Sequence, residues 1–253
     1  MCAGYTTGPM RFTESRSLAA VLAAACTLHA AAAPSAELLD LAGRVHYGYY
    51  HGEPRALDAA AAALERLGDS PEVAYYRDVA ALRRAQLGGA ERSNAERLRE
   101  CAHREVAPGV NKLAAAEAWV LVAACAFVAG DERRRVLALE RARERDDDNP
   151  RIGLVEAWAL DAAAGTDAAH REAATKKLAA VVEAFDTWSP PLDAPDWGHA
   201  EALTALAAKA LDGGQPRTAR DLIERALLLA PDYRAAVELR VALQTSRSDG
   251  RAL

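Results

Sequence analysis

The sequence predicts an all-α protein arranged as a solenoid of αα-hairpins, with about five helix pairs and a final capping helix. No long stretch alternates polar and apolar residues with period two, and the abundance of Ala, Leu, Arg and Glu favours helix. A series of prolines recurs roughly every 40 residues, a period typical of stacked helical repeats. These are Pro71, Pro108, Pro150, Pro190 and Pro231.

Eleven helices account for most of the chain. Four starts are marked by prolines in the first turn, where the missing amide hydrogen removes no hydrogen bond; these are Pro54, Pro71, Pro150 and Pro216. Ser70, Asn149 and Asp196 are expected N-caps. Short links favour antiparallel neighbours. The expected helices are residues 36–50, 54–67, 71–87, 93–106, 111–129, 131–145, 150–164, 167–186, 197–211, 216–229 and 233–246.

Residues 1–33 are expected to form a leader, with Met10 as the true start of translation. A weakly basic head precedes a short apolar stretch and a run of alanines, an order typical of secretory signals. The alternative is an Ala-rich first helix of the fold. Residues 34–246 then form the helical-repeat domain, and residues 247–253 form a frayed tail.

Cys26 adds a second route for the leader. The sequence LAAAC at residues 22–26 resembles a bacterial lipobox, although Ala23 stands where Leu is usual. Lipidation of Cys26 would anchor the protein to a membrane, whereas cleavage near Ala32 would release it into the periplasm. Both routes predict a periplasmic protein or one associated with the outer membrane.

Two further cysteines, Cys101 and Cys125, lie on consecutive expected helices. In an oxidising compartment they could form a disulfide. Two buried free thiols are equally compatible with the sequence, because the distance between their Cα atoms is not readable from it.

Composition and motifs argue against several functional classes. The net charge of −5 and the lack of a basic stripe argue against nucleic acid as a partner. There is no HExxH, CxxC, Gly-rich phosphate loop or GxSxG sequence, so we expect no metal, no cofactor and no catalytic residues. Residues 113–129 contain one charge, Glu117, but are shorter than the ~20 residues of a membrane span, which favours a buried helix.

The helix pair at residues 201–233 carries a recognisable set of residues. Small side chains occupy positions where paired helices approach closely, one bulky side chain fills the gap between them, a glycine makes the turn and Pro-Asp closes the unit. They are Ala207, Gly214, Ala219, Ile223, Ala226 and Pro231-Asp232. This unit resembles the tetratricopeptide repeat, whose fold is a right-handed αα-hairpin solenoid.

Residues 116–145 resemble the same repeat. The matching residues are Trp119, Ala123, Gly130-Asp131, Leu139 and Ala142. The unit departs from the pattern at Arg135, which replaces a small residue, and at the closing proline, Pro150, which comes three residues late. The resemblance covers about 65 residues, and the remaining pairs keep the period but little of the consensus.

The resemblance implies a scaffold or adaptor without enzymatic activity that binds protein partners of the cell envelope. In the family, the first helix of each pair lines a groove. The corresponding positions are Glu117, Val120, Ala124 and Phe127 in one unit and Glu201, Thr204, Ala208 and Leu211 in the other. They include no Lys, Arg or Asn, so the family's cationic clamp for a carboxylate is absent. The alternative is that these faces pack against other helices.

A loop rich in proline and tryptophan precedes the last helix pair. Trp188, Pro190, Pro191 and Trp197 suit a rigid surface for a partner, because large rings on a stiff backbone make good interface anchors. The alternative is a structural corner, with Asp196 capping the next helix and Trp197 packing on the preceding one.

Two other groups of residues suggest a small-molecule carrier or an enzyme as alternatives to the scaffold. Five tyrosines are candidates to gather and line a pocket for an apolar ligand, although plain packing explains them as well; they are Tyr47, Tyr49, Tyr50, Tyr75 and Tyr76, with His46 and His51 beside them. His199, near Asp193, Asp196 and Glu201, is the best general base that the sequence offers, but no nucleophile accompanies it.

Overall fold

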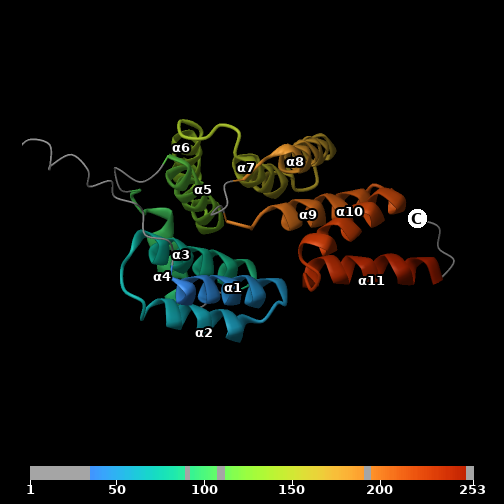
Figure 1. Cartoon of the computed structure of the whole chain (residues 1–253). Coiled ribbons are helices and arrows are strands. Elements are labelled where there is room, and N and C mark those ends of the chain that lie inside the picture. Colours follow the sequence, from blue (N-terminus) through green and yellow to red (C-terminus); the bar gives the residue numbers. More distant parts are fainter. Residues whose placement is uncertain (1–34, 89–91, 107–111, 191–194, 249–253) are drawn as a thin grey trace, which may run out of the picture. The chain divides into compact units, whose positions relative to one another are not determined.

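The computed structural model describes residues 35–88, 92–106, 112–190 and 195–248, and all the regular structure in these ranges is helical. Eleven helices follow one another along the described chain (Figure 1). They are α1 (Ala36–Tyr50), α2 (Pro54–Leu64), α3 (Pro71–Gln86), α4 (Arg92–Ala102), α5 (Lys112–Ala129), α6 (Glu132–Arg143), α7 (Pro150–Ala164), α8 (Ala168–Thr187), α9 (His199–Asp212), α10 (Pro216–Leu229) and α11 (Arg234–Ser248). The prediction of eleven helices and no strand is confirmed for this part of the chain.

Local sequence signals set most helix starts. Ser70 accepts a hydrogen bond from the amide of Val73 at 3.3 Å, and Asn149 caps α7 through the amide of Arg151 at 3.1 Å, so both predicted N-caps are confirmed. The expected cap Asp196 is wrong. The N-cap of α9 is Gly198, whose φ of 109° is a conformation that favours glycine.

Consecutive helices pack as pairs, α1 with α2 and so on to α9 with α10 (Figure 1). We call the odd-numbered helices A helices and the even-numbered ones B helices. A helices also pack on one another in the series α1, α3, α5 and α7, and α11 packs on α9 and α10. Small residues permit the close approach: a Cβ atom on Gly48 of α1 would lie 2.9 Å from the backbone nitrogen of Leu57 on α2.

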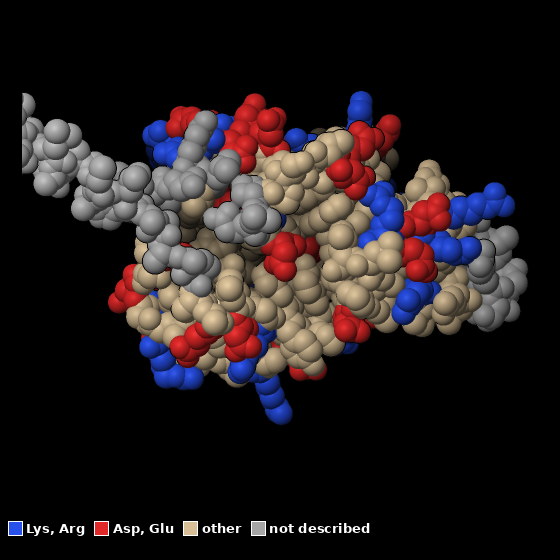
Figure 2. Space-filling model, viewed as in Figure 1, with Lys and Arg blue, Asp and Glu red and all other residues tan. Residues whose placement is uncertain are grey.

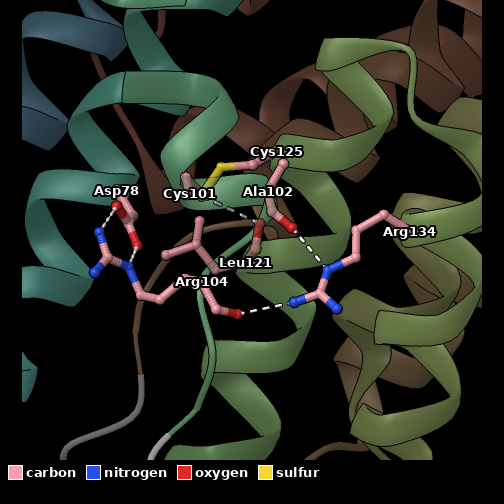
Figure 3. Close-up of a disulfide and its surroundings, with 7 residues drawn as sticks. All are labelled: Asp78, Cys101, Ala102, Arg104, Leu121, Cys125 and Arg134. Carbon is pink, nitrogen blue, oxygen red and sulfur yellow. Dashed lines mark hydrogen bonds and ion pairs between the residues drawn. A yellow bond between two sulfur atoms is a disulfide. The ribbon is translucent and has the colours of Figure 1, made fainter. Parts of the chain in front are cut away.

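A disulfide joins the B helix of the second pair to the A helix of the third. Cys101 and Cys125 are fully buried, and their Cα atoms lie 6.0 Å apart. Figure 3 shows the surroundings: Arg134 of α6 donates hydrogen bonds to the backbone oxygens of Ala102, at 2.9 Å, and Arg104, at 3.0 Å. These bonds occupy carbonyls where α4 ends, four residues before the predicted end of that helix.

Helices far apart in the sequence also meet. The Tyr233 ring, just before α11, lies 6.0 Å from the Tyr49 ring and 5.0 Å from the Tyr50 ring, both on α1. His46 of α1 pairs with Asp196 at 2.9 Å. In a regular solenoid each pair contacts only its neighbours, but the first pair here also packs against residues that flank α9 and α11.

Several expectations concern residues outside the described ranges. These are the leader of residues 1–33 with its start at Met10, the lipidation site Cys26, the loop residue Pro191, and residues 249–253 of the tail. Ser248 ends α11, two residues beyond the predicted end of that helix. None of the helices in the described ranges combines the length and the hydropathy needed to span a bilayer.

Candidate functional site: an ionic junction and the adjoining cleft

Five buried side chains from different parts of the fold meet on the A-helix side of the molecule. They are Arg83 of α3, Glu117 of α5, Arg151 of α7, Trp197 just before α9 and Glu201 of α9, and none of them is more than 7% exposed. We call this set the ionic junction. Buried charges of this kind require paired partners, because an isolated ion in the interior is strongly destabilising.

Arg151 joins α7 to α5 and to the segment before α9. Its guanidinium donates to the Glu117 carboxylate at 3.0 Å, to the backbone oxygen of Trp197 at 2.8 Å, and to that of Pro195. Asn149 donates to the same Glu117 oxygen at 2.8 Å. Burial raises the pKa of Glu117, although Arg151 and Asn149 both favour its charged form.

Arg83 joins α3 to α9. It donates to one Glu201 oxygen and, at 2.8 Å, to the side-chain oxygen of Gln86. The other Glu201 oxygen accepts from the Gly198 amide at 2.8 Å and from the Tyr50 hydroxyl at 3.4 Å. Burial acts to lower the pKa of Arg83, but the Glu201 carboxylate and the hydroxyls of Tyr49, Tyr50 and Tyr233 together outweigh burial, so the net pKa is raised and the guanidinium stays charged.

Trp197 lies between the two arginines. The centre of its ring lies 5.5 Å from the guanidinium carbon of Arg83 and 5.3 Å from that of Arg151. The indole nitrogen of Trp197 donates to the Tyr75 hydroxyl at 3.0 Å. This ring is 1% exposed and serves as a structural anchor of the segment that leads into α9.

An open cleft of about 580 Å³ adjoins the junction. Its lining comes from α1, α3, α7, α9 and α11 and from the turn before α11. The lining residues are Tyr49, Gln86, Trp158, Glu201, Thr204, Ala205, Ala208, Tyr233, Ala235, Glu238, Leu239 and Ala242. We call this feature the cleft.

The cleft has small apolar walls and aromatic side chains. Alanines make up half of the lining residues from α9 and α11, whereas Tyr49, Tyr233 and Trp158 supply rings. Burial raises the pKa values of Tyr49 and Tyr233, so both remain neutral phenols. The carboxylates in the lining are Glu201, held in the junction, and Glu238, and no Lys or Arg is among the described lining residues.

The predicted groove residues divide between packed and open positions. Val120 and Ala124 are fully buried and Glu117 belongs to the junction, so the first unit has the packed arrangement given as the alternative. Phe127 is half-buried against Trp158, with ring centres 6.2 Å apart.

The second unit is more open. Ala208 is half-buried and lines the cleft together with the buried residues Glu201 and Thr204, whereas Leu211 is half-buried against the core.

The predicted interface loop has mostly a structural place. Trp197 is buried in the junction, and Trp188 is half-buried, with the guanidinium carbon of Arg151 4.9 Å from its ring centre. Pro190 is exposed, and Pro191 lies outside the described residues. The three described residues of the predicted loop therefore do not form one exposed surface.

The tyrosines gather in two groups rather than one. Tyr49 and Tyr50 meet Tyr233, which was not among the five predicted tyrosines. Tyr75 and Tyr76 lie together with ring centres 5.3 Å apart, next to Trp197. Tyr47 is 49% exposed and stacks on His51, with ring centres 4.0 Å apart.

His199 packs as an aromatic residue. Its ring stacks on Phe185, with centres 5.0 Å apart, and its Nε2 lies 3.3 Å from an Asp186 oxygen. Burial lowers the pKa of His199, although Asp186 acts in the opposite sense. Over the described ranges, no group of three or more His, Cys, Asp or Glu side chains is arranged to hold a metal ion.

Sequence reasoning missed the two arginines of the junction. Arg83 follows apolar residues in the stretch VAALRR, and Arg151 precedes apolar residues in the stretch PRIGLV. An Arg on the apolar face of an A helix was the available signal, because such a charge needs a buried carboxylate. Glu117 and Glu201 were already singled out at equivalent repeat positions.

Charges of both signs are interspersed on the surface. On the face drawn in Figure 2, Lys and Arg lie among Asp and Glu, above all over α6 and α10, and much of the surface between them is uncharged. A partner on this face would therefore meet no extended field of one sign.

Comparisons of the chain with models of protein families, with curated proteins and with solved structures found no match.

Proposed function

We propose that this protein is a non-enzymatic, exported scaffold or adaptor, similar in architecture to tetratricopeptide-repeat proteins, that binds a segment of a partner protein in the bacterial cell envelope. The observation that carries this proposal is the open cleft. It takes three of its lining residues, Glu201, Thr204 and Ala208, from positions that the repeat family uses for binding. Its apolar walls suit burial of a partner's apolar side chains.

The helix packing supports the repeat architecture. Consecutive helices form pairs, and the A helices of successive pairs α1, α3, α5 and α7 contact one another, as expected when pairs stack with a common orientation. The buried Cys101–Cys125 disulfide supports export, because such bonds persist in oxidising compartments and are rare in the cytosol.

Site-specific photocrosslinking in intact cells tests the function. A photoreactive residue at Ala208, in the cleft, is expected to give an adduct of defined mass in the envelope fraction. The same residue at Leu137 on α6, which is 41% exposed, is the matched control and is expected to give none. Filling the cleft with Ala205→Trp should remove the adduct. Identical adducts from both positions, or none from Ala208, would contradict the proposal.

Cell fractionation tests the location. We expect the full chain in the periplasm or with the outer membrane and a variant without residues 1–33 in the cytoplasm. Cys26→Ser separates the two export routes, because it should release a lipoprotein from the membrane fraction and leave a cleaved soluble protein unchanged. Retention of the full chain in the cytoplasm would refute export.

The volume of the cleft favours a second candidate, a carrier of a small apolar ligand. About 580 Å³ lies within the range of ligand pockets, and Tyr49, Tyr233 and Trp158 supply aromatic surface. A thermal-shift screen with lipids and organic acids tests this function, because a ligand that binds the folded state raises the melting temperature. A ligand whose effect disappears in Ala205→Trp would favour the carrier.

A further inference from the structure

We propose that the cleft binds an amphipathic helix of the partner, with large aliphatic side chains against α9 and α11 and a Lys or Arg paired to Glu238. This inference rests on the proposed function that the cleft holds a partner segment. It adds the conformation and the charge of that segment.

The spacing of apolar residues on α11 gives the cleft a wall that matches a helix. Ala235, Leu239 and Ala242 lie at i, i+4 and i+7 and therefore on one face. From α9, Ala205 and Ala208 contribute at i and i+3. The four alanines let another helix approach closely and place its larger side chains between them.

The backbone of the walls argues against an extended segment. Both walls are helices, whose interior amides and carbonyls are bonded within the helix, so they offer no edge to which a strand could add. An extended partner would leave backbone groups unpaired against the alanines. A helix brings its own hydrogen bonds, and the span from Ala235 to Ala242, about 10 Å at 1.5 Å per residue, corresponds to two turns.

The charge of the partner follows from the carboxylates of the cleft. Glu201 is engaged by Arg83, Gly198 and Tyr50 and is 5% exposed, so it has little capacity for a new ion. Glu238 is different: its side chain is 62% exposed, and its bond to Arg234, at 2.7 Å, is an exposed pair within one helix. Such pairs are weak, so a basic group of the partner can replace Arg234 at Glu238.

Three synthetic peptides of 15 residues test the inference on the purified protein. The first is a helix of Leu, Ala and Gln with leucines at i, i+4 and i+7 and two flanking lysines; the second has Glu for Lys; the third has a central proline that breaks the helix. Fluorescence anisotropy is expected to show the lysine helix binding at least tenfold more tightly than the other two. A tenfold difference corresponds to about 1.4 kcal/mol.

Two charge-reversal variants locate the effect. Glu238→Lys should remove the preference for lysine or reverse it. Glu144→Lys, at an exposed position at the end of α6, should leave the preference unchanged. Both positions are more than half exposed, so both variants should fold, which their melting temperatures would verify.

Equal affinity for the helical and the proline peptide would overturn helix recognition, and so would the absence of binding by all three. Equal affinity for the Lys and Glu helices, unaltered by Glu238→Lys, would overturn the role of Glu238. If Ala208 gives a crosslinked adduct but the peptides show no preference for the helix or for lysine, the proposed function stands and this inference is refuted. If the lysine helix is preferred but no adduct forms in cells, this inference stands and the proposed function is refuted.

Discussion

The two buried arginines differ in how far they reach along the chain. Arg151 on α7 pairs with Glu117 on α5, 34 residues earlier, and these two A helices pack directly on one another. Arg83 on α3 pairs with Glu201 on α9, 118 residues later. The first pair joins neighbours in a series, whereas the second joins two helices that the series alone would leave unconnected.

The same residue type thus performs two structural tasks. Arg151 also donates to the carbonyls of Pro195 and Trp197, so it orders the segment before α9. Arg83 then holds the beginning of α9 through Glu201, which borders the cleft. One short segment, residues 195–201, therefore takes part both in the contacts of Arg151 and in those of Arg83.

Removing the neighbour pair is expected to have the largest effect. Arg151→Met leaves the Glu117 carboxylate buried without a cation and two carbonyls without donors, so we expect a loss of about 3–5 kcal/mol in the free energy of unfolding. Urea denaturation at pH 7 measures it. Arg141→Met, which breaks a pair about half exposed on α6, is the control and should change stability by less than about 1 kcal/mol. Equal effects of the two substitutions would contradict the assigned role of Arg151.

The disulfide is the covalent counterpart of the neighbour pair, since it also attaches to α5. Replacing both cysteines, Cys101→Ser with Cys125→Ser, releases a cross-link between residues 24 apart in sequence, for which we expect a loss of about 3 kcal/mol. Urea denaturation with and without a reducing agent checks this value. Reduced wild-type protein should match the double variant, and an unchanged midpoint after reduction would show that the cross-link does not stabilise the fold.

Removing the distant pair should have a smaller and more local effect. Arg83→Met leaves Glu201 with its bonds from Gly198 and Tyr50, so we expect a loss of about 2–3 kcal/mol. Hydrogen exchange should quicken mainly in α1, α9 and α11. The same measurement on Arg151→Met should show faster exchange in α5 and α7. If both variants showed faster hydrogen exchange in the same helices, the distinction between the pair of neighbouring helices and the pair of distant helices would be contradicted.

The smallest expected effect concerns His199, at the start of α9. Burial holds its folded-state pKa below 6.5, so the unfolded chain binds a proton before the folded protein does, and stability is lost as the pH falls below 6.5. His199→Phe retains a ring that can stack on Phe185 and removes this titration. We expect the melting temperature of the variant to fall less than that of the wild type between pH 7 and pH 5. Parallel curves would show that His199 does not contribute to acid sensitivity.

Much of the local structure was predictable because it depends on residues close together in sequence. The first-turn prolines, the caps Ser70 and Asn149 and the helix-favouring composition all act within one turn. The failed cap, Asp196, shows the limit of such reasoning, since that carboxylate pairs with His46, 150 residues earlier. The backbone of Gly198 and the side chain of Glu201 begin α9 instead.

The candidate site was predictable only in part. The repeat register singled out Glu117 and Glu201, and it named Ala208 and Thr204, which do line the cleft. It did not reveal that Arg83 and Arg151 neutralise the two carboxylates. Nor did it reveal that Val120 and Ala124 are fully buried, or that the Tyr233 ring packs against those of Tyr49 and Tyr50.

The helical class, the approximate ends of the helices in the described ranges and the positions of small residues could be read from the sequence, because propensity, capping and turn chemistry act over a few residues. Three features emerged only from the folded chain: the pairing of Cys101 with Cys125, the partners of the buried arginines, and the choice of A-helix positions that line the cleft. These depend on distances between residues that are 24 to 118 positions apart, and only the packing of whole helices sets such distances.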